Sequence, residues 1–278
     1  MANFNRQAEV IVGPPGGDGT KITGNRIIFN IRKSDKADAN SMEVQVYNLA
    51  PGTRKEFEDL ENVVMLNAGY PSTMRLVAMG DITRCETVYN LPDRITTATC
   101  GDGLRTMSET RVSLSYEGAV SARAIIDDIA GEMELELRET EADMSGRFRS
   151  GWAFVGPARE AMNLVTRRFG LEWSIQNGEL QVTERRGENT LEAVVISPQT
   201  GLIGSPQNLD DNREDLPGDK ENPGVQFRCL MNPLIEPNGI VILEAREFER
   251  AEYRVKVVEH RGDTRGDVWE TMVEAVER

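Results

Sequence analysis

Short segments in which apolar and polar residues alternate dominate both ends of this chain, and they constrain its fold more than any other feature. Along 42–49, for example, Met42, Val44 and Val46 share one face while polar side chains share the other. A period of two is typical of strands with one buried face, and Gly, Pro and Asn clusters between segments indicate turns. The expected strands are 26–31, 42–49, 63–70, 74–82 and 93–103 at the start, and 191–197, 224–231, 239–245 and 252–260 at the end.

The middle of the chain changes to helical spacing and contains an internal repeat. Ser121 is a suitable N-cap for a helix that reaches Met133, and Gly156-Pro157 opens a second helix that Gly170 should end. An alternating strand follows each helix, and the units are offset by 36 residues (158 − 122), with these corresponding pairs: Ala122 and Ala158, Arg123 and Arg159, Ile126 and Met162, Ile129 and Val165, Met133 and Phe169. Neither unit could bury its apolar face alone, so the two should pack together.

Three further local signals complete the expected secondary structure. Asn177-Gly178 stands between two alternating runs, which predicts a tight β-hairpin. A proline opens the segment 51–60, where a short helix is expected. Another short helix is expected at the C-terminus around Trp269, Met272 and Val273.

The order of elements predicts a β-rich α+β fold in which an α/β module is inserted between two β regions. We expect an N-terminal β-barrel region over 1–114, the inserted α/β module with its helix-strand repeat over 115–190, and a C-terminal β-barrel region over 191–278. In this arrangement the first and last strands belong to one continuous β framework. The segment 206–224 is rich in Pro, Gly, Asn and Asp, so we expect it to be a flexible acidic loop.

The charge and the cysteine content narrow the classes of partner. The formal net charge is −14, from 46 acidic and 32 basic residues, and an acidic surface repels phosphate backbones and anionic lipids. This argues against specific nucleic-acid binding and against membrane binding. No stretch approaches the roughly 18 apolar residues of a membrane helix, and the first residues do not resemble a signal peptide. Three widely spaced cysteines suit a reducing compartment, so assembly in a cytoplasm is expected.

No residue pattern indicates catalytic, cofactor-binding or metal-binding residues, and the chain is predicted not to be an enzyme. The glycine-rich segment 13–21 lacks the Gly-Lys-Ser/Thr spacing of a phosphate loop. One histidine, His260, excludes a multi-His metal site, and it is expected at the surface or in an interface. The adjacent carboxylates either diverge on a helix or lie in the expected loop: Asp127-Asp128, Asp210-Asp211 and Glu214-Asp215.

Several stretches resemble the central hub protein of phage tails, the trimeric ring between tail tube and spike in a baseplate. They occur in the same order over both β regions: NRIIFNIRKSDKADANSMEVQVYNLAPGTRKEFE (25–58), VVMLNAGYPSTMRLVAMGDIT (63–83), TGLIGSPQ (200–207), GVQFRCLMNPLIEPNGIVIL (224–243) and YRVKVVEHRGDTRGDVWET (253–271). The resemblance implies a homotrimer in which each chain contributes two tube-like barrel halves. Such a ring of six similar units would adapt a six-fold tube to a three-fold spike.

The resemblance also implies partners and a location. The spike protein and the tail tube protein are the expected partners, with the tape-measure protein as a further candidate. The chain would belong to the virion tail, after assembly in the host cytoplasm. DNA would pass through the lumen, and we hypothesise that acidic side chains partly line it so that DNA slides without adhering.

Two other functions stay open on the sequence. A carbohydrate- or receptor-binding tail module would require exposed aromatic clusters in a groove, whereas Trp152, Trp173 and Trp269 fall in segments patterned for burial. A hydrolase built on carboxylates would require two converging acids with perturbed pKa values in a cleft.

Overall fold

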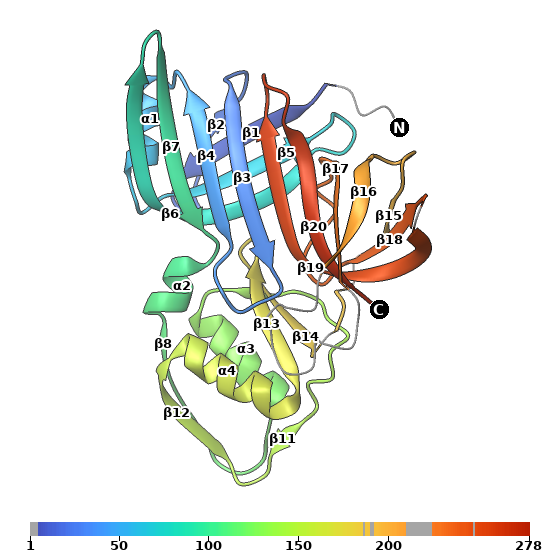
Figure 1. The fold of residues 1–278 in the computed structure, drawn as a ribbon. Helices are drawn as coiled ribbons and strands as arrows, with labels where there is room; N and C mark the ends of the chain where they lie inside the picture. Colours follow the sequence, from blue (N-terminus) through green and yellow to red (C-terminus); the bar gives the residue numbers. More distant parts are fainter. Residues whose placement is uncertain (1–4, 186, 190–191, 210–223, 247) are drawn as a thin grey trace.

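The computed structural model describes residues 5–185, 187–189, 192–209, 224–246 and 248–278. Its main feature is one antiparallel-rich sheet of 13 strands, with the helical part of the chain at one end of it (Figure 1). The strands from the first part of the chain are β1 (Gln7–Gly13), β2 (Thr20–Ile22), β3 (Ile27–Ser34), β4 (Ser41–Tyr47), β5 (Val63–Gly69), β6 (Arg75–Asn90) and β7 (Asp93–Gly101). Those from the last part are β15 (Val194–Ile196), β16 (Leu202–Leu209), β17 (Gly224–Leu230), β18 (Ile240–Ala245), β19 (Phe248–Asp263) and β20 (Trp269–Glu277).

The two ends of the chain meet in this sheet through the pairing of β3 with β19. The register runs from Ile28 opposite Asp263 to Ser34 opposite Val257. One sheet therefore contains strands from both β regions, which confirms the expected continuous β framework. Each half nevertheless has its own apolar core, and Met231 and Trp269 of the C-terminal half join the N-terminal one.

Both halves of the sheet repeat one strand order. The N-terminal half follows the path β3-β4-β7-β6-β5, and the C-terminal half follows β16-β17-β20-β19-β18. In each half, the fourth strand along the chain has 16 residues and bridges two neighbours. The pairing of this long strand with the fifth strand shifts register at the same place, between Ile82 and Arg84 in β6 and between Val255 and Val257 in β19. The chain thus contains two copies of a five-strand unit.

The C-terminal segment forms a strand, so the helix expected there is wrong. In β20, Trp269, Thr271, Val273 and Ala275 alternate with less buried residues. This segment satisfies both a helical and an alternating pattern of apolar residues. Pairing with β17 on one side and β19 on the other satisfies its backbone groups in the sheet.

The described ends of the segment 206–224, where a loop is expected, are strands. Residues 206–209 belong to β16, which pairs with β17, and β17 begins at Gly224. Residues 210–223 lie outside the described residues. Pro206 is tolerated in the strand because it falls within an irregularity of the pairing between Ile203 and Gln207.

The helical part of the chain has its own core and small sheets. It contains α2 (Leu104–Glu109), β8 (Arg111–Tyr116), β9 (Val120–Ser121), α3 (Ala122–Glu132), β10 (Glu136–Leu137), β11 (Arg147–Phe148), β12 (Trp152–Pro157), α4 (Ala158–Phe169), β13 (Leu171–Gln176) and β14 (Glu179–Glu184). We call 104–184 the helical module. The inward faces of α3 and α4 pack in one cluster with β13 and β14. The boundaries predicted at 114 and 190 stay predictions, and β8 runs through the first of them.

Local sequence signals explain several ends and turns. The Ser121 hydroxyl accepts a hydrogen bond from the Ala124 backbone N–H at 3.2 Å, which caps α3. Gly170 ends α4 with a φ of 70°. Asn177 and Gly178 have φ values of 57° and 79° and join β13 to β14, so the predicted hairpin is confirmed. The expected helix over 51–60 is α1 (Pro51–Glu58), whose Phe57 is fully buried.

Candidate functional site

The outward face of the large sheet carries polar side chains across both halves of the chain. Glu43, Asn30, Arg261 and Glu270 lie opposite one another along β4, β3, β19 and β20. All four are at least partly exposed. Arg261 forms an ion pair with Glu259 at 2.7 Å, so charges of both signs stand side by side on this face. It is a hydrated surface rather than a face made for burial in the chain's own core.

Several strands leave a backbone edge without a partner strand. Among the described strands of the large sheet, β2, β15 and β16 pair on one side only. The long strand β6 pairs with β5 over 75–81 and with β7 over 81–90, so residues 83–90 have β7 as their only partner strand. We call 83–90 the outer half of β6. Exposed edges of this kind are templates for pairing with another chain.

The tip of the β6–β7 hairpin exposes large apolar side chains. Val88, Tyr89 and Leu91 are 50%, 66% and 89% exposed. The guanidinium of Arg94 lies 5.7 Å from the centre of the Tyr89 ring. An exposed group of this kind, next to a free strand edge, is a feature of surfaces that contact other proteins.

A buried polar cluster attaches the helical module to the sheet. The Lys33 ammonium, 1% exposed, donates to Asn177 Oδ1 at 2.7 Å, at the tip of the β13–β14 hairpin. The Asp102 carboxylate accepts from the backbone N–H groups of Asn177 at 2.6 Å and Gly178 at 3.0 Å. Burial lowers the pKa of Lys33, against the opposing effect of the Glu236 and Asp102 carboxylates. The hairpin tip is therefore held by hydrogen bonds to both Lys33 and Asp102, whose opposite charges also attract each other.

Further ion pairs strengthen this junction. Arg138 of the module bonds to Glu179 at 2.8 Å and to Glu236 at 2.9 Å, and the latter belongs to the segment before β18. Burial raises the pKa of the Asp102 carboxyl, although Lys33 and the two backbone N–H groups oppose this shift. Such a network fixes the orientation of the module on the sheet. The sequence contains one signal of this network: Lys33 falls at an inward-facing position of β3, in the same alternation as Ile27, Phe29 and Ile31.

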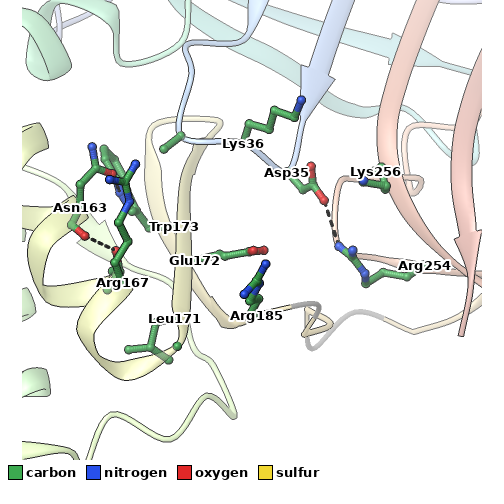
Figure 2. Close-up of a pocket in the computed structure, with 13 residues that line it drawn as sticks. Asp35, Lys36, Asn163, Arg167, Leu171, Glu172, Trp173, Arg185, Arg254 and Lys256 are labelled. Carbon is green, nitrogen blue, oxygen red and sulfur yellow. Dashed lines mark hydrogen bonds and ion pairs between the residues drawn. The ribbon is translucent and has the colours of Figure 1, made fainter. Parts of the chain in front are cut away.

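A concave site of about 390 Å³ lies between the module and the sheet (Figure 2). Lys36 and Lys256 come from the sheet side, Arg167 and Glu172 come from the module, and Arg185 directly follows the module, as the sticks of Figure 2 show. Four further lining residues form two pairs: Asp35 with Arg254 at 3.0 Å, and the Trp173 indole N–H with Asn163 Oδ1 at 2.9 Å. Since Asp35 is held by a guanidinium and Trp173 is buried, the site has neither a pair of converging carboxylates nor a free aromatic platform.

His260 is buried, so the expectation of a surface or interface position is wrong. It is 2% exposed, and its Nδ1 lies 2.9 Å from Thr271 Oγ1 of β20. Burial lowers the pKa of His260 to about 3, and the positive charge of Lys33 adds to this effect. The imidazole is therefore a neutral member of a core. Asp263 lies three residues further along β19 and forms an ion pair with Arg26 at 2.6 Å.

The acidic pair Asp127-Asp128, which also stood out in the sequence, is engaged with neighbouring side chains. Asp127 pairs with Arg123 at 2.8 Å, and Asp128 accepts a hydrogen bond from the Tyr116 hydroxyl. The other acidic pairs lie outside the described residues. Burial raises the pKa of the Cys100 and Cys229 thiols to about 12, which disfavours the thiolate. Within the described ranges, no group of three His, Cys, Asp or Glu residues could hold a metal ion.

The aromatic residues of the module pack on one another. Trp152 stacks on Phe154 with ring centres 5.9 Å apart and also approaches Phe148 and Tyr116. These partly buried rings lie against the core of the module. Trp269 packs edge-on against Phe29.

No helix in the described part of the chain is long and apolar enough to cross a membrane.

Comparison with known proteins identifies the fold. No protein-family model matches the sequence, and no curated protein matches it. Solved structures do match. The 43 kDa tail protein of prophage MuSo2 from Shewanella oneidensis is similar with a TM-score of 0.69 and 9% identity, over 97% of this chain and 98% of that one. A tail protein from Neisseria meningitidis has a TM-score of 0.67 and 13% identity, over 99% and 97% of the two chains.

A third structure extends the likeness to a secretion system. It is an Escherichia coli component of the type VI secretion system, described as similar to the T4 bacteriophage tail proteins gp27 and gp5. Its TM-score is 0.65 at 11% identity, over 96% of this chain and 76% of that chain. The chain therefore has the fold of phage tail proteins, and the resemblance noted in the sequence is confirmed at the level of fold.

Proposed function

We propose that this chain is a structural hub of a phage-type tail, in which three copies form a ring between tail tube and spike. The observation that carries the proposal is the five-strand unit repeated in one sheet, with free strand edges at both ends of the repeat. Three chains would supply six similar units. Such a ring can present six-fold features to a tube and three-fold features to a spike.

The free edges support a head-to-tail mode of assembly. β16 ends the sheet on the C-terminal side, and the outer half of β6 is open on the N-terminal side. Contacts between two different surfaces of one chain are heterologous, and they close into a ring when the rotation between neighbours permits it. Each of the two units would form one barrel half, with the helical module as the insertion between them.

The outward sheet face supports a conduit role. It continues from β4 through β3 and β19 to β20, and it carries charges of both signs. A wall of this kind lacks a block of cations that could hold a phosphate backbone, and the net charge of −14 opposes adhesion further. DNA would pass through the lumen without specific binding. The chain would itself have no catalytic role, which the pairing of Asp35 with Arg254 in the concave site and of Asp127 with Arg123 in the module supports.

The same proposal places the chain in the virion tail baseplate, after assembly in the host cytoplasm. Its partners would be the spike and tube proteins, with the tape-measure protein as a further candidate. The rigid junction of module and sheet, with Lys33 and Asp102 at its centre, would keep the module at a constant angle for such contacts.

Light scattering coupled to size-exclusion chromatography tests the ring. A homotrimer has a mass of 3 × 31.0 = 93.0 kDa. We expect this mass for the purified chain, and class averages from electron microscopy should show a three-fold ring with a central opening. A chain that stays monomeric at high concentration, both alone and with its spike and tube proteins, would contradict the proposal.

A further inference from the structure

The internal junction between β3 and β19 provides a template for the contact between copies. Positions in β6 and β19 correspond when 173 is added to the β6 number (248 − 75). Asp81 and Arg254 correspond in this way, and each pairs with the first residue of the preceding strand, Val63 in β5 and Ile240 in β18. The correspondence between β6 and β19 therefore holds for the pairing with the preceding strand as well as for the pairing with the following strand, where the register shifts coincide.

Side-chain contacts obey the same correspondence. Thr87 Oγ1 of β6 lies 3.1 Å from Thr96 Oγ1 of β7. At the equivalent place, His260 Nδ1 of β19 lies 2.9 Å from Thr271 Oγ1 of β20. The two long hairpins are thus built alike, although the residues differ.

The two hairpins differ in what covers them. Val258, His260 and Gly262 of β19 are buried, because β3 pairs alongside them: Val258 belongs to the C-terminal core, and His260 and Gly262 lie opposite Ile31 and Phe29 of the N-terminal core. Their equivalents in β6 are Cys85, Thr87 and Tyr89, which are partly or fully exposed. The outer half of β6 therefore has the geometry of β19 but lacks the strand that β3 supplies.

Residue sizes at the two places are complementary. Gly262 lies between Phe29 of β3 and Trp269 of β20, whose rings meet edge-on with centres 5.5 Å apart. A Cβ on Gly262 would come within 2.3 Å of the Phe29 ring. In β6 the position of this glycine is occupied by Tyr89. A strand that pairs with the outer half of β6 must therefore have a small residue at the position where β3 has Phe29.

β16 is the strand that fits this requirement. It corresponds to β3 in the repeated strand order, and the place of Phe29 is taken by the irregularity between Ile203 and Gln207, where Pro206 is buried in the chain itself and Gly204 and Ser205 are exposed. A Cβ added at Gly204 would have no neighbour within 4 Å, so that space is open. Aromatic side chains placed over a glycine of a neighbouring strand stabilise sheets in this way.

We propose that the outer half of β6 pairs with β16 of a second copy of this chain, and that Tyr89 packs over Gly204 of that copy. We call this contact the seam. It rests on the proposed ring and assigns the strands and residues that close it. Transfer of the β3–β19 register places Gln207 opposite Val88, and Asn208 opposite Thr87. The hairpin tip would complete the C-terminal core of the neighbour, as Trp269 completes the N-terminal one.

Substitution at Tyr89 tests the energetic part of the seam. Because Tyr89 is 66% exposed in the single chain, Y89A should leave the fold of each copy intact, as its circular dichroism and melting under dissociating conditions would verify. Tyrosines at the centre of an interface are typical hot spots, so we expect the protein concentration for half-dissociation of the trimer to rise by at least about tenfold. The matched control is V155A, which removes another exposed apolar side chain, 77% exposed, on β12 of the module. It should leave that concentration unchanged.

Cysteine pairs test the register. Directly opposed residues of antiparallel strands have Cα atoms about 4.5–5.5 Å apart, which suits a disulfide. We expect V88C combined with Q207C to give covalent trimers on oxidation. V88C combined with V195C, on the free edge of β15, should not cross-link.

The outcomes separate the seam from the ring. A 93.0 kDa trimer in which V88C/Q207C stays unlinked and Y89A has no effect would overturn the seam while the proposed ring stands. Cross-linking by V88C/V195C instead would assign the edge to β15 and also overturn it. A chain that forms no trimer would overturn both.

Discussion

His260 offers a direct test of the packing between β19 and β20. It is the only histidine of the chain, so its titration can be followed without a second imidazole. In the folded chain it is fully enclosed, bonded to Thr271 and near the buried Lys33, and burial lowers its pKa to about 3. In the unfolded chain the ordinary value of 6.5 applies. The variant to compare is H260Q, which cannot take up a proton.

The magnitude follows from the two pKa values. Below pH 6.5 the unfolded chain binds a proton that the folded chain excludes, so acidification favours unfolding until the pH reaches the folded value of about 3. Each pH unit in this window costs about 1.4 kcal/mol of unfolding free energy. At pH 5.0 the loss attributable to His260 is therefore about 2 kcal/mol relative to pH 7.5.

Urea unfolding at pH 7.5, 6.0 and 5.0, at one protein concentration, measures this effect. H260Q should lose about 2 kcal/mol less than the natural sequence between the highest and the lowest pH, whatever its stability at pH 7.5. T271V removes the hydrogen-bond partner but keeps the imidazole, and it should retain the pH dependence. Equal slopes for H260Q and the natural sequence would refute the placement of a neutral histidine in this core.

Two further substitutions test the helical module. D102A leaves the backbone N–H groups of Asn177 and Gly178 without their acceptor and removes a negative charge near the buried Lys33 ammonium, so we expect a loss of about 3–5 kcal/mol in urea unfolding and faster hydrogen exchange at the β13–β14 hairpin. The exposed ion pair changed by D127A should contribute less than about 1 kcal/mol, and a similar loss for both would contradict the buried junction. S121A removes the cap of α3 and should cost about 1 kcal/mol, measured in the same way, whereas S121D should restore most of it.

The elements that the sequence predicts correctly are those whose signal lies within a few neighbouring residues. Alternation along β4 and helical spacing along α3 and α4 predicted those elements, because burial of one face depends on the period of the residues themselves. The hairpin at Asn177-Gly178 followed from the positive φ that its turn requires. Residues that satisfied two periods, such as those of β20, were assigned wrongly.

The candidate site was the least predictable part. Nothing in the sequence singles out the outer half of β6, because a free edge is defined by which strand does not lie beside it. Tyr89 and its equivalent Gly262 are different residue types, so the repeat of the five-strand unit is visible only in the pairing and register of the strands. His260 was misplaced because its neighbours in β3 and β20 are distant in sequence.

The sequence by itself determined that this chain is rich in strands, that its middle is a helix-strand repeat, and that its surface is acidic. Only the tertiary structure decided that the two β regions share one sheet, that the five-strand unit occurs twice, and which edges stay open. Side-chain periodicity reports only whether a residue faces a core. The order of strands is decided by backbone hydrogen bonds between distant segments, and those bonds are largely independent of residue type.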